Sequence, residues 1–113
     1  MIIDRNILNK IAHHCATCLK GLPTRNTVST MQFVIGDDGM HIKYVGATME
    51  YDYLLNDIRI GDNGIYAVNA WKFVGVINAL VDDNIDLTIQ DNVLNISTER
   101  TSIQLNIEIM SPL

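Results

Sequence analysis

The chain lacks a hydrophobic run long enough to cross a bilayer, since its longest apolar stretch, Phe73 to Val81, already contains Asn78. It also lacks a signal peptide, because Asp4 and Arg5 interrupt the N-terminus before any apolar run develops. With only two cysteines in 113 residues, it cannot be a disulfide-stapled secreted mini-protein. These absences predict a cytoplasmic protein with no membrane partner.

Catalytic and cofactor motifs are missing too: there is no Gly-rich phosphate loop, no Gly-x-Ser-x-Gly and no His-Glu-x-x-His. His13, His14, Cys15 and Cys18 form one dense group of metal-ligand side-chain types. On a single helix the two histidines would point about 100° apart, and both cysteines fall on the apolar side. We therefore expect buried, structural cysteines and no enzyme, metal or cofactor. A small zinc or thiol enzyme is the alternative that this group alone supports.

What the chain does contain is apolar residues, at 48%, against 19% charged ones. This balance predicts one compact domain, residues 1–113, with a buried core. The net charge of −5 is unevenly distributed, because residues 1–46 carry five bases and three acids, whereas residues 47–113 carry three bases and ten acids. From Arg5 to Arg25 there are four bases and no acid. Such a segment can hold a phosphate backbone, or it can be an ordinary solvated helix face.

The stretch Arg5 to Leu19 predicts an amphipathic helix, which Asp4 would cap and Gly21 and Pro23 would end. Helical spacing gathers its apolar residues on one side: Ile7, Leu8, Ile11, Cys15, Cys18 and Leu19. The opposite side collects Asn6, Lys10, His13, Thr17 and Lys20.

Alternating apolar residues, separated by turn clusters, predict antiparallel strands in the rest of the chain. The expected strands are 30–35, 40–44, 51–55, 65–68, 85–89, 94–98 and 103–109, with a second helix over 70–81. Met1 to Ile3 allows one more short strand. Each half, about 1–60 and 61–113, then follows the order strand–helix–three strands, which is an internal repeat. The predicted class is α+β, with two helices side by side on antiparallel sheet.

Two groups of local strings resemble one protein family. The first comprises Leu22-Pro23-Thr24, Gly36-Asp37-Asp38-Gly39-Met40 and Gly46-Ala47-Thr48-Met49-Glu50. The second comprises Ile65 to Phe73, Asp82-Asp83-Asn84-Ile85 and Asn92-Val93-Leu94-Asn95-Ile96. In order and spacing they are similar to the first domain of bacterial and phage DNA sliding clamps, the ring-shaped processivity factors of replicative polymerases.

The resemblance implies that the helices line a channel around duplex DNA and that the sheets form the outside of a ring. Non-specific backbone contacts would come from Lys10, His13, Thr17, Lys20, Arg25 and Lys72. Trp71, Gly75 and Asn78 stand where bacterial clamps tend to place charged residues, so Lys72 is the single base of the second helix.

Assembly and partners follow from the same resemblance. Family rings contain six such domains, so this chain is expected to be either one piece of a longer clamp or a single-domain homo-oligomer, most simply a hexamer. Its subunit contacts would lie on the last strands of the repeats, at Tyr51, Tyr53, Leu105 and Ile107. The expected partners are duplex DNA and a replicative polymerase or clamp loader, in a bacterial cell or a phage-infected host. The alternative is a clamp-fold module that binds or inhibits a replication partner without encircling DNA.

Overall fold

The structure is a computed structural model that describes residues 1–19, 30–45 and 50–112. Its helices are α1 (Arg5–Leu19) and α2 (Ala70–Ala79), and neither is long and apolar enough to cross a membrane. The strands are β1 (Ile2–Asp4), β2 (Thr30–Gly36), β3 (Gly39–Val45), β4 (Glu50–Asn56), β5 (Gly64–Asn69), β6 (Asn84–Gln90), β7 (Val93–Ser97), β8 (Ser102–Asn106) and β9 (Glu108–Pro112).

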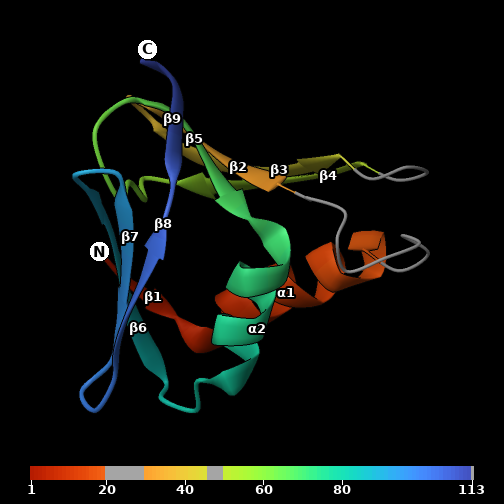
Figure 1. The fold of residues 1–113 in the computed structure, drawn as a ribbon, viewed down its shortest axis with the longest axis vertical. Helices are drawn as coiled ribbons and strands as arrows, with labels where there is room; N and C mark the ends of the chain where they lie inside the picture. Colours follow the sequence, from red (N-terminus) through yellow and green to blue (C-terminus); the bar gives the residue numbers. More distant parts are fainter. Residues whose placement is uncertain (20–29, 46–49, 113) are drawn as a thin grey trace.

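The strands form two antiparallel sheets, with orders β1-β6-β7-β8 and β4-β3-β2-β5-β9. The first strand of each half joins the sheet of the other half: β1 pairs with β6, and β5 pairs with β2. In Figure 1 the four-stranded sheet lies at the left, the five-stranded sheet at the top, and both helices in the angle between them. The α+β class and the two helices are confirmed, whereas the division of the strands into two sheets was not predicted.

Both helices begin as their sequences predict. Asp4 accepts a hydrogen bond from the backbone N–H of Asn6 at 2.7 Å, which caps α1. Asn69 does the same for α2 by accepting from the N–H of Lys72 at 3.0 Å. On the predicted apolar side of α1, Leu8, Ile11 and Cys15 are buried, as the helical spacing predicts, and Ile7 is half-buried. Ala12, which was not predicted, is buried as well.

One hydrophobic core joins the helices to both sheets. At its centre the fully buried rings of Phe33 on β2 and Phe73 on α2 meet edge to face, with centroids 5.6 Å apart. Ile3 on β1 and Ile85 on β6 are register partners and are buried in the same core. Because each half contributes to both sheets, neither half encloses a core of its own.

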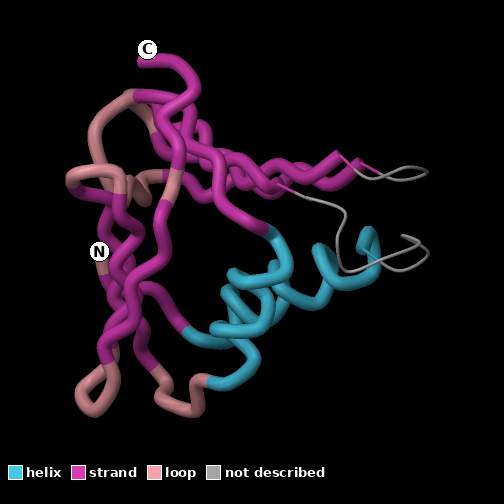
Figure 2. The backbone as a smooth tube through the Cα atoms, in the orientation of Figure 1, coloured by secondary structure: helices cyan, strands magenta, loops and turns pink. Residues whose placement is uncertain are grey.

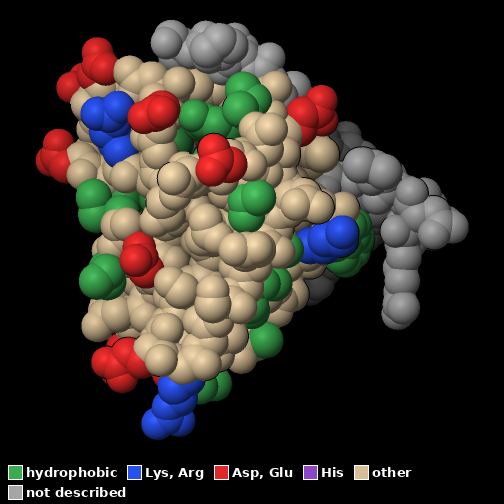
Figure 3. All heavy atoms as spheres, turned by 60° about the vertical axis from the view of Figure 1, so that its left-hand side comes forward, with side chains coloured by type: hydrophobic (Ala, Val, Ile, Leu, Met, Phe, Trp, Pro, Cys, Tyr) green, Lys and Arg blue, Asp and Glu red, His purple; other side chains and the backbone are tan. Residues whose placement is uncertain are grey.

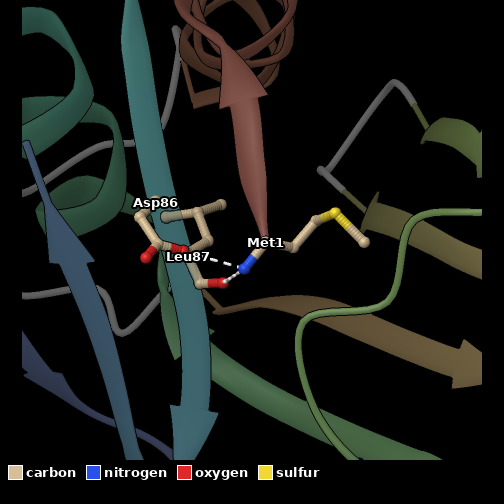
Figure 4. A network of polar contacts seen from close by, with 3 residues as sticks. All are labelled: Met1, Asp86 and Leu87. Atoms are coloured by element: carbon tan, nitrogen blue, oxygen red, sulfur yellow. Dashed lines mark hydrogen bonds and ion pairs between the residues drawn. The ribbon is translucent and has the colours of Figure 1, made fainter.

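The start of β1 is held by the α-amino group of Met1. This group donates to Asp86 Oδ1 at 2.8 Å and to the carbonyl of Leu87 at 3.1 Å (Figure 4). At the other end of β1, the N–H of Arg5 donates to the carbonyl of Asp83 at 2.8 Å. Polar contacts thus secure both ends of this short edge strand against β6 and the turn before it.

Two sequence-based boundaries were wrong. The second helix ends at Ala79, not Val81, because Leu80 is extended (ψ 138°) and caps the helix through its N–H to the carbonyl of Ile77. The expected strand 103–109 is two strands, since the N–H of Ile107 turns to the carbonyl of Asn92 at 3.0 Å. Before this point β8 pairs with β7, and after it β9 pairs with β5. The last strand therefore passes from one sheet to the other.

Tyr66, on β5, is buried, and its hydroxyl donates to the carbonyl of Asp62 at 2.8 Å. Burial of the phenol, and to a smaller extent the charge of Asp62, raises the pKa of Tyr66 above its ordinary value near 10. The folded state therefore favours the protonated phenol, and the unfolded chain loses this proton first as the pH rises.

Tyr66→Phe is therefore expected to cost about 1 kcal/mol of unfolding free energy near neutral pH, through the lost hydrogen bond. At about pH 10.5 the difference in unfolding free energy between wild type and variant should shrink. The reason is that only the wild type has a phenol at position 66, whose ionisation in the unfolded chain lowers the stability. Urea unfolding of both proteins at the two pH values measures this. A difference that widens at high pH would contradict the assignment.

Candidate nucleic-acid interface

The two helices contain no acidic residue, although the chain has 13. Lys10 on α1 and Lys72 on α2 are both exposed, as is His13. The helices lie side by side in the angle between the two sheets (Figure 2). The described acids all lie on strands and in turns, and one of them, Asp83, lies 3.8 Å from Arg5 at the start of α1. The helices therefore combine bases with no carboxylate of their own.

Basic and aromatic side chains, which we call the α1–β4 cluster, lie between α1 and β4: Lys10, His13, His14, Tyr51 and Tyr53. His14 Nδ1 lies 3.2 Å from the Tyr51 hydroxyl, and their ring centroids are 4.9 Å apart. The rings of Tyr51 and Tyr53 are stacked, with their centroids 6.3 Å apart. The Lys10 ammonium lies 5.9 Å from the centroid of the Tyr53 ring. His13 joins the cluster through His14, because their ring centroids lie 5.9 Å apart.

The residues predicted to contact DNA differ in their exposure to solvent. Lys10, His13 and Lys72 are exposed on the helices. Thr17 is half-buried and its hydroxyl donates to the carbonyl of His13 at 3.1 Å, so this hydroxyl already has a backbone partner. Lys20 and Arg25 lie outside the described residues. His14 contacts Tyr51, which is 37 residues away, so no local sequence pattern predicts its place in the cluster.

The predicted subunit contacts point inward more than expected. Tyr51, Tyr53, Leu105 and Ile107 are partly buried side chains packed against the core. Ile107 lies between two strands, and its N–H is already bonded to Asn92. Within the described residues, the open feature of these strands is the backbone edge: β4 pairs only with β3, and β8 only with β7.

Figure 3 shows the molecule from the side of the four-stranded sheet, where separate acidic side chains lie among uncharged ones. The register aligns three uncharged polar residues in one row across this sheet, Thr88, Asn95 and Gln104. The next row consists of Asp86, Ser97 and Ser102, and its one acid, Asp86, is paired with the Met1 amino group. Exposed edge strands are usually protected by charged side chains or by a proline. β8 contains neither, so a strand from another molecule could pair with its open edge.

Metal chemistry finds no support in the part of the chain that the structure describes. No group of three or more histidine, cysteine or acidic side chains is placed to share an ion there. Cys15 is fully buried, as expected, whereas the side chain of Cys18 lies outside the description. Trp71 is 40% exposed on α2, so it belongs to the open helix surface rather than to the core.

Comparison with known proteins finds relatives by structure but not by sequence. No protein-family model matches the chain, and no curated protein matches its sequence. Among solved structures, the Helicobacter pylori beta clamp bound to a DNA ligase peptide superposes with a TM-score of 0.74 over 96% of this chain, at 18% identity. The fold is that of a sliding-clamp domain.

Two further bacterial structures agree. The DNA polymerase III beta subunit of Pseudomonas aeruginosa gives a TM-score of 0.72 at 20% identity over 96% of this chain. The Thermotoga maritima protein gives 0.76 at 14% identity over 94%. The chain spans only 29–30% of the length of these sliding clamps. The resemblance to the clamp family is thus confirmed at the level of the fold.

Proposed function

We propose that the protein is a DNA sliding clamp subunit or domain that tethers a replicative polymerase to duplex DNA. The observation that carries this proposal is the charge distribution: within a sliding-clamp fold, the helix pair has no acid and exposes Lys10, His13 and Lys72. The role is non-enzymatic, and it would be carried out in the cytoplasm of a bacterium or of a phage-infected host.

The grip on DNA would be electrostatic and independent of sequence. Exposed ammonium groups on the helices contact phosphates, and the bound counterions that they displace make the affinity fall as salt rises. No contact to base edges is needed, so the protein can move along the duplex. Acids elsewhere on the protein leave the local field at the helices positive within a Debye length of about 8–10 Å.

Assembly would use the open edges of the two sheets. The β4 edge of one copy can pair with the β8 edge of the next, which continues the sheet from subunit to subunit and removes both exposed edges. A single copy of 12.7 kDa cannot surround a duplex, so a closed ring requires several domains, most simply six. This head-to-tail arrangement keeps the helices of every copy on the same side of the sheets.

Replication partners are part of the same proposal. The Helicobacter pylori clamp binds a DNA ligase peptide, and we propose that this chain likewise engages a replication protein, a polymerase or a clamp loader. Because each sheet has an outer face that lies away from the helices (Figure 1), such a partner can bind there while the helices face DNA.

Self-assembly around DNA is directly measurable. We expect light scattering at increasing concentrations to give a mass well above 12.7 kDa. Labelled protein should remain on a nicked circular duplex during gel filtration and leave when the same DNA is linearised. A constant monomer mass, with equal retention on circular and linear DNA, would overturn the self-assembled ring.

Edge variants test how the copies join. The double substitution Ser102→Lys and Gln104→Lys puts two cations on the exposed side of β8 and should weaken association at least about tenfold. Thr88→Lys with Asn95→Lys is the matched control, because it adds the same charge to the same sheet face on strands that are already paired. Equal effects of both pairs would show that β8 is not the joining edge.

The alternative is a clamp-fold module that binds a replication partner without encircling DNA. It is favoured by the small number of described bases on the exposed helix surface and by the sequence pI near 4.9. A protein that stays monomeric and shows no salt-dependent DNA affinity, yet binds a polymerase or clamp, would establish this function instead.

A further inference from the structure

The outer face of the five-stranded sheet, away from the helices, carries a row of three apolar side chains and one histidine that no described element covers. Met31, Phe33 and Ile35 of β2 are buried, so the alternate residue Val34 points outward. Its register partners are His41 on β3 and Ile65 on β5, and Leu54 on β4 is the partner of His41. Leu54 is 49% exposed, although it lies in this regular row.

A hollow of about 410 Å³ lies at the hairpin end of this row; we call it the outer hollow. It is lined by Val34, Gly36, Asp37, Asp38, Gly39, His41, Leu54 and Asn56. Gly36 and Gly39 are register partners, and a Cβ at Gly36 would meet nothing within 4 Å. Gly39 has φ +148°, and a Cβ there would collide with the carbonyl oxygen of Leu55. The missing side chain at Gly36 therefore leaves the hollow open, whereas Gly39 allows the β4 backbone to pass close by.

Hydrogen bonds hold the turn beside the outer hollow in place. Asp57 donates its N–H to the carbonyl of Asp38 at 2.9 Å, which joins the β2–β3 turn to the end of β4. Asn63 donates to Asp37 Oδ1 at 2.7 Å, and Arg59 donates to Asn63. The turn is thus held from two sides before any ligand arrives, so binding would order little of the protein.

The hollow is negatively charged on one side and apolar on the other. Asp37 and Asp38 are exposed, and neither forms an ion pair among the described residues. The nearby Asp52 differs, because His41 lies 2.8 Å and Lys43 3.9 Å from its carboxylate oxygens. Val34 and Leu54 provide the apolar wall. The complementary ligand therefore combines a cation with an adjacent aliphatic side chain.

We propose that the outer hollow is a docking site for a short segment of a partner protein that presents an arginine beside an aliphatic residue. The guanidinium would bind the Asp37 and Asp38 carboxylates, for which its planar fork is better matched than an ammonium. The aliphatic side chain would cover Leu54 and Val34, whose exposed apolar surface is removed from water. The site lies on the side of the five-stranded sheet away from the helices, so it goes beyond the proposed DNA function and does not depend on it.

Two dipeptide probes separate this site from non-specific attraction. We expect acetyl-Leu-Arg-amide to shift the NMR amide signals of Gly36, Gly39, His41 and Leu54 in isotope-labelled protein, and to do so saturably. Acetyl-Leu-Gln-amide, which keeps the leucine but lacks the charge, should bind at least about fivefold more weakly. Equal binding of the two probes, or signal changes spread over the surface, would overturn the proposal.

Protein variants locate the contacts. Asp37→Asn with Asp38→Asn should remove the preference for the arginine probe, whereas Glu99→Gln, an exposed acid in a distant turn, should leave it intact. Leu54→Ser should weaken both probes by a similar factor, because it removes only the apolar wall. An arginine preference that survives the double aspartate variant would show that the cation binds elsewhere.

Discussion

Phe73→Ala is expected to lower the free energy of unfolding by about 3–5 kcal/mol. The ring of Phe73 is fully buried and meets Phe33 edge to face, so it joins α2 to the five-stranded sheet. Removing it leaves a cavity between a helix and a sheet that belong to the same core. Urea unfolding followed by circular dichroism measures the loss.

Trp71→Ala is the matched control, two residues away on the same helix. Its larger side chain is 40% exposed, so its removal should cost less than about 1 kcal/mol. If Phe73→Ala proves unfolded, Phe73→Leu keeps most of the volume and should lose a smaller, measurable amount. Equal costs for Phe73→Ala and Trp71→Ala would contradict the described packing of α2.

The second large effect concerns DNA. The double variant Lys10→Glu and Lys72→Glu replaces two exposed cations on the helix pair by anions and should weaken DNA binding by at least about a hundredfold at low salt. The plot of log affinity against log salt should also flatten by about two units, one for each lost phosphate contact. Titration of a labelled duplex at several salt concentrations measures both quantities.

Lys43→Glu with Arg100→Glu is the control, because it changes the net charge equally but lies on the outer sheet face and in the β7–β8 turn. It should retain nearly all the binding and the full salt slope. In the opposite direction, Gly75→Lys adds a base to α2 where a Cβ meets nothing within 4 Å, and binding should tighten. Equal losses in both double variants would mean that total charge, not the helix surface, attracts DNA.

The sequence by itself determined the local structure and the class of the fold. Hairpin β2–β3 and the apolar side of α1 were predictable, because their signals are alternation, helical spacing and turn residues within a few positions of one another. The absence of acids from both helices is also a property of the sequence. These features depend on neighbours along the chain, so no knowledge of distant contacts is needed.

Only the tertiary structure decided which strands pair and which side chains meet. Ile3 pairs with Ile85, and His14 meets Tyr51, through contacts that no local pattern encodes. The break at Ile107 is invisible in the sequence, since the alternation of Ile103, Leu105, Ile107 and Ile109 continues unchanged while the strand moves to another sheet. Leu80 likewise keeps the helical spacing but is buried in an extended conformation. The spacing of apolar residues in the sequence predicts which residues face a core. Which residues they pack against depends on how the whole chain folds.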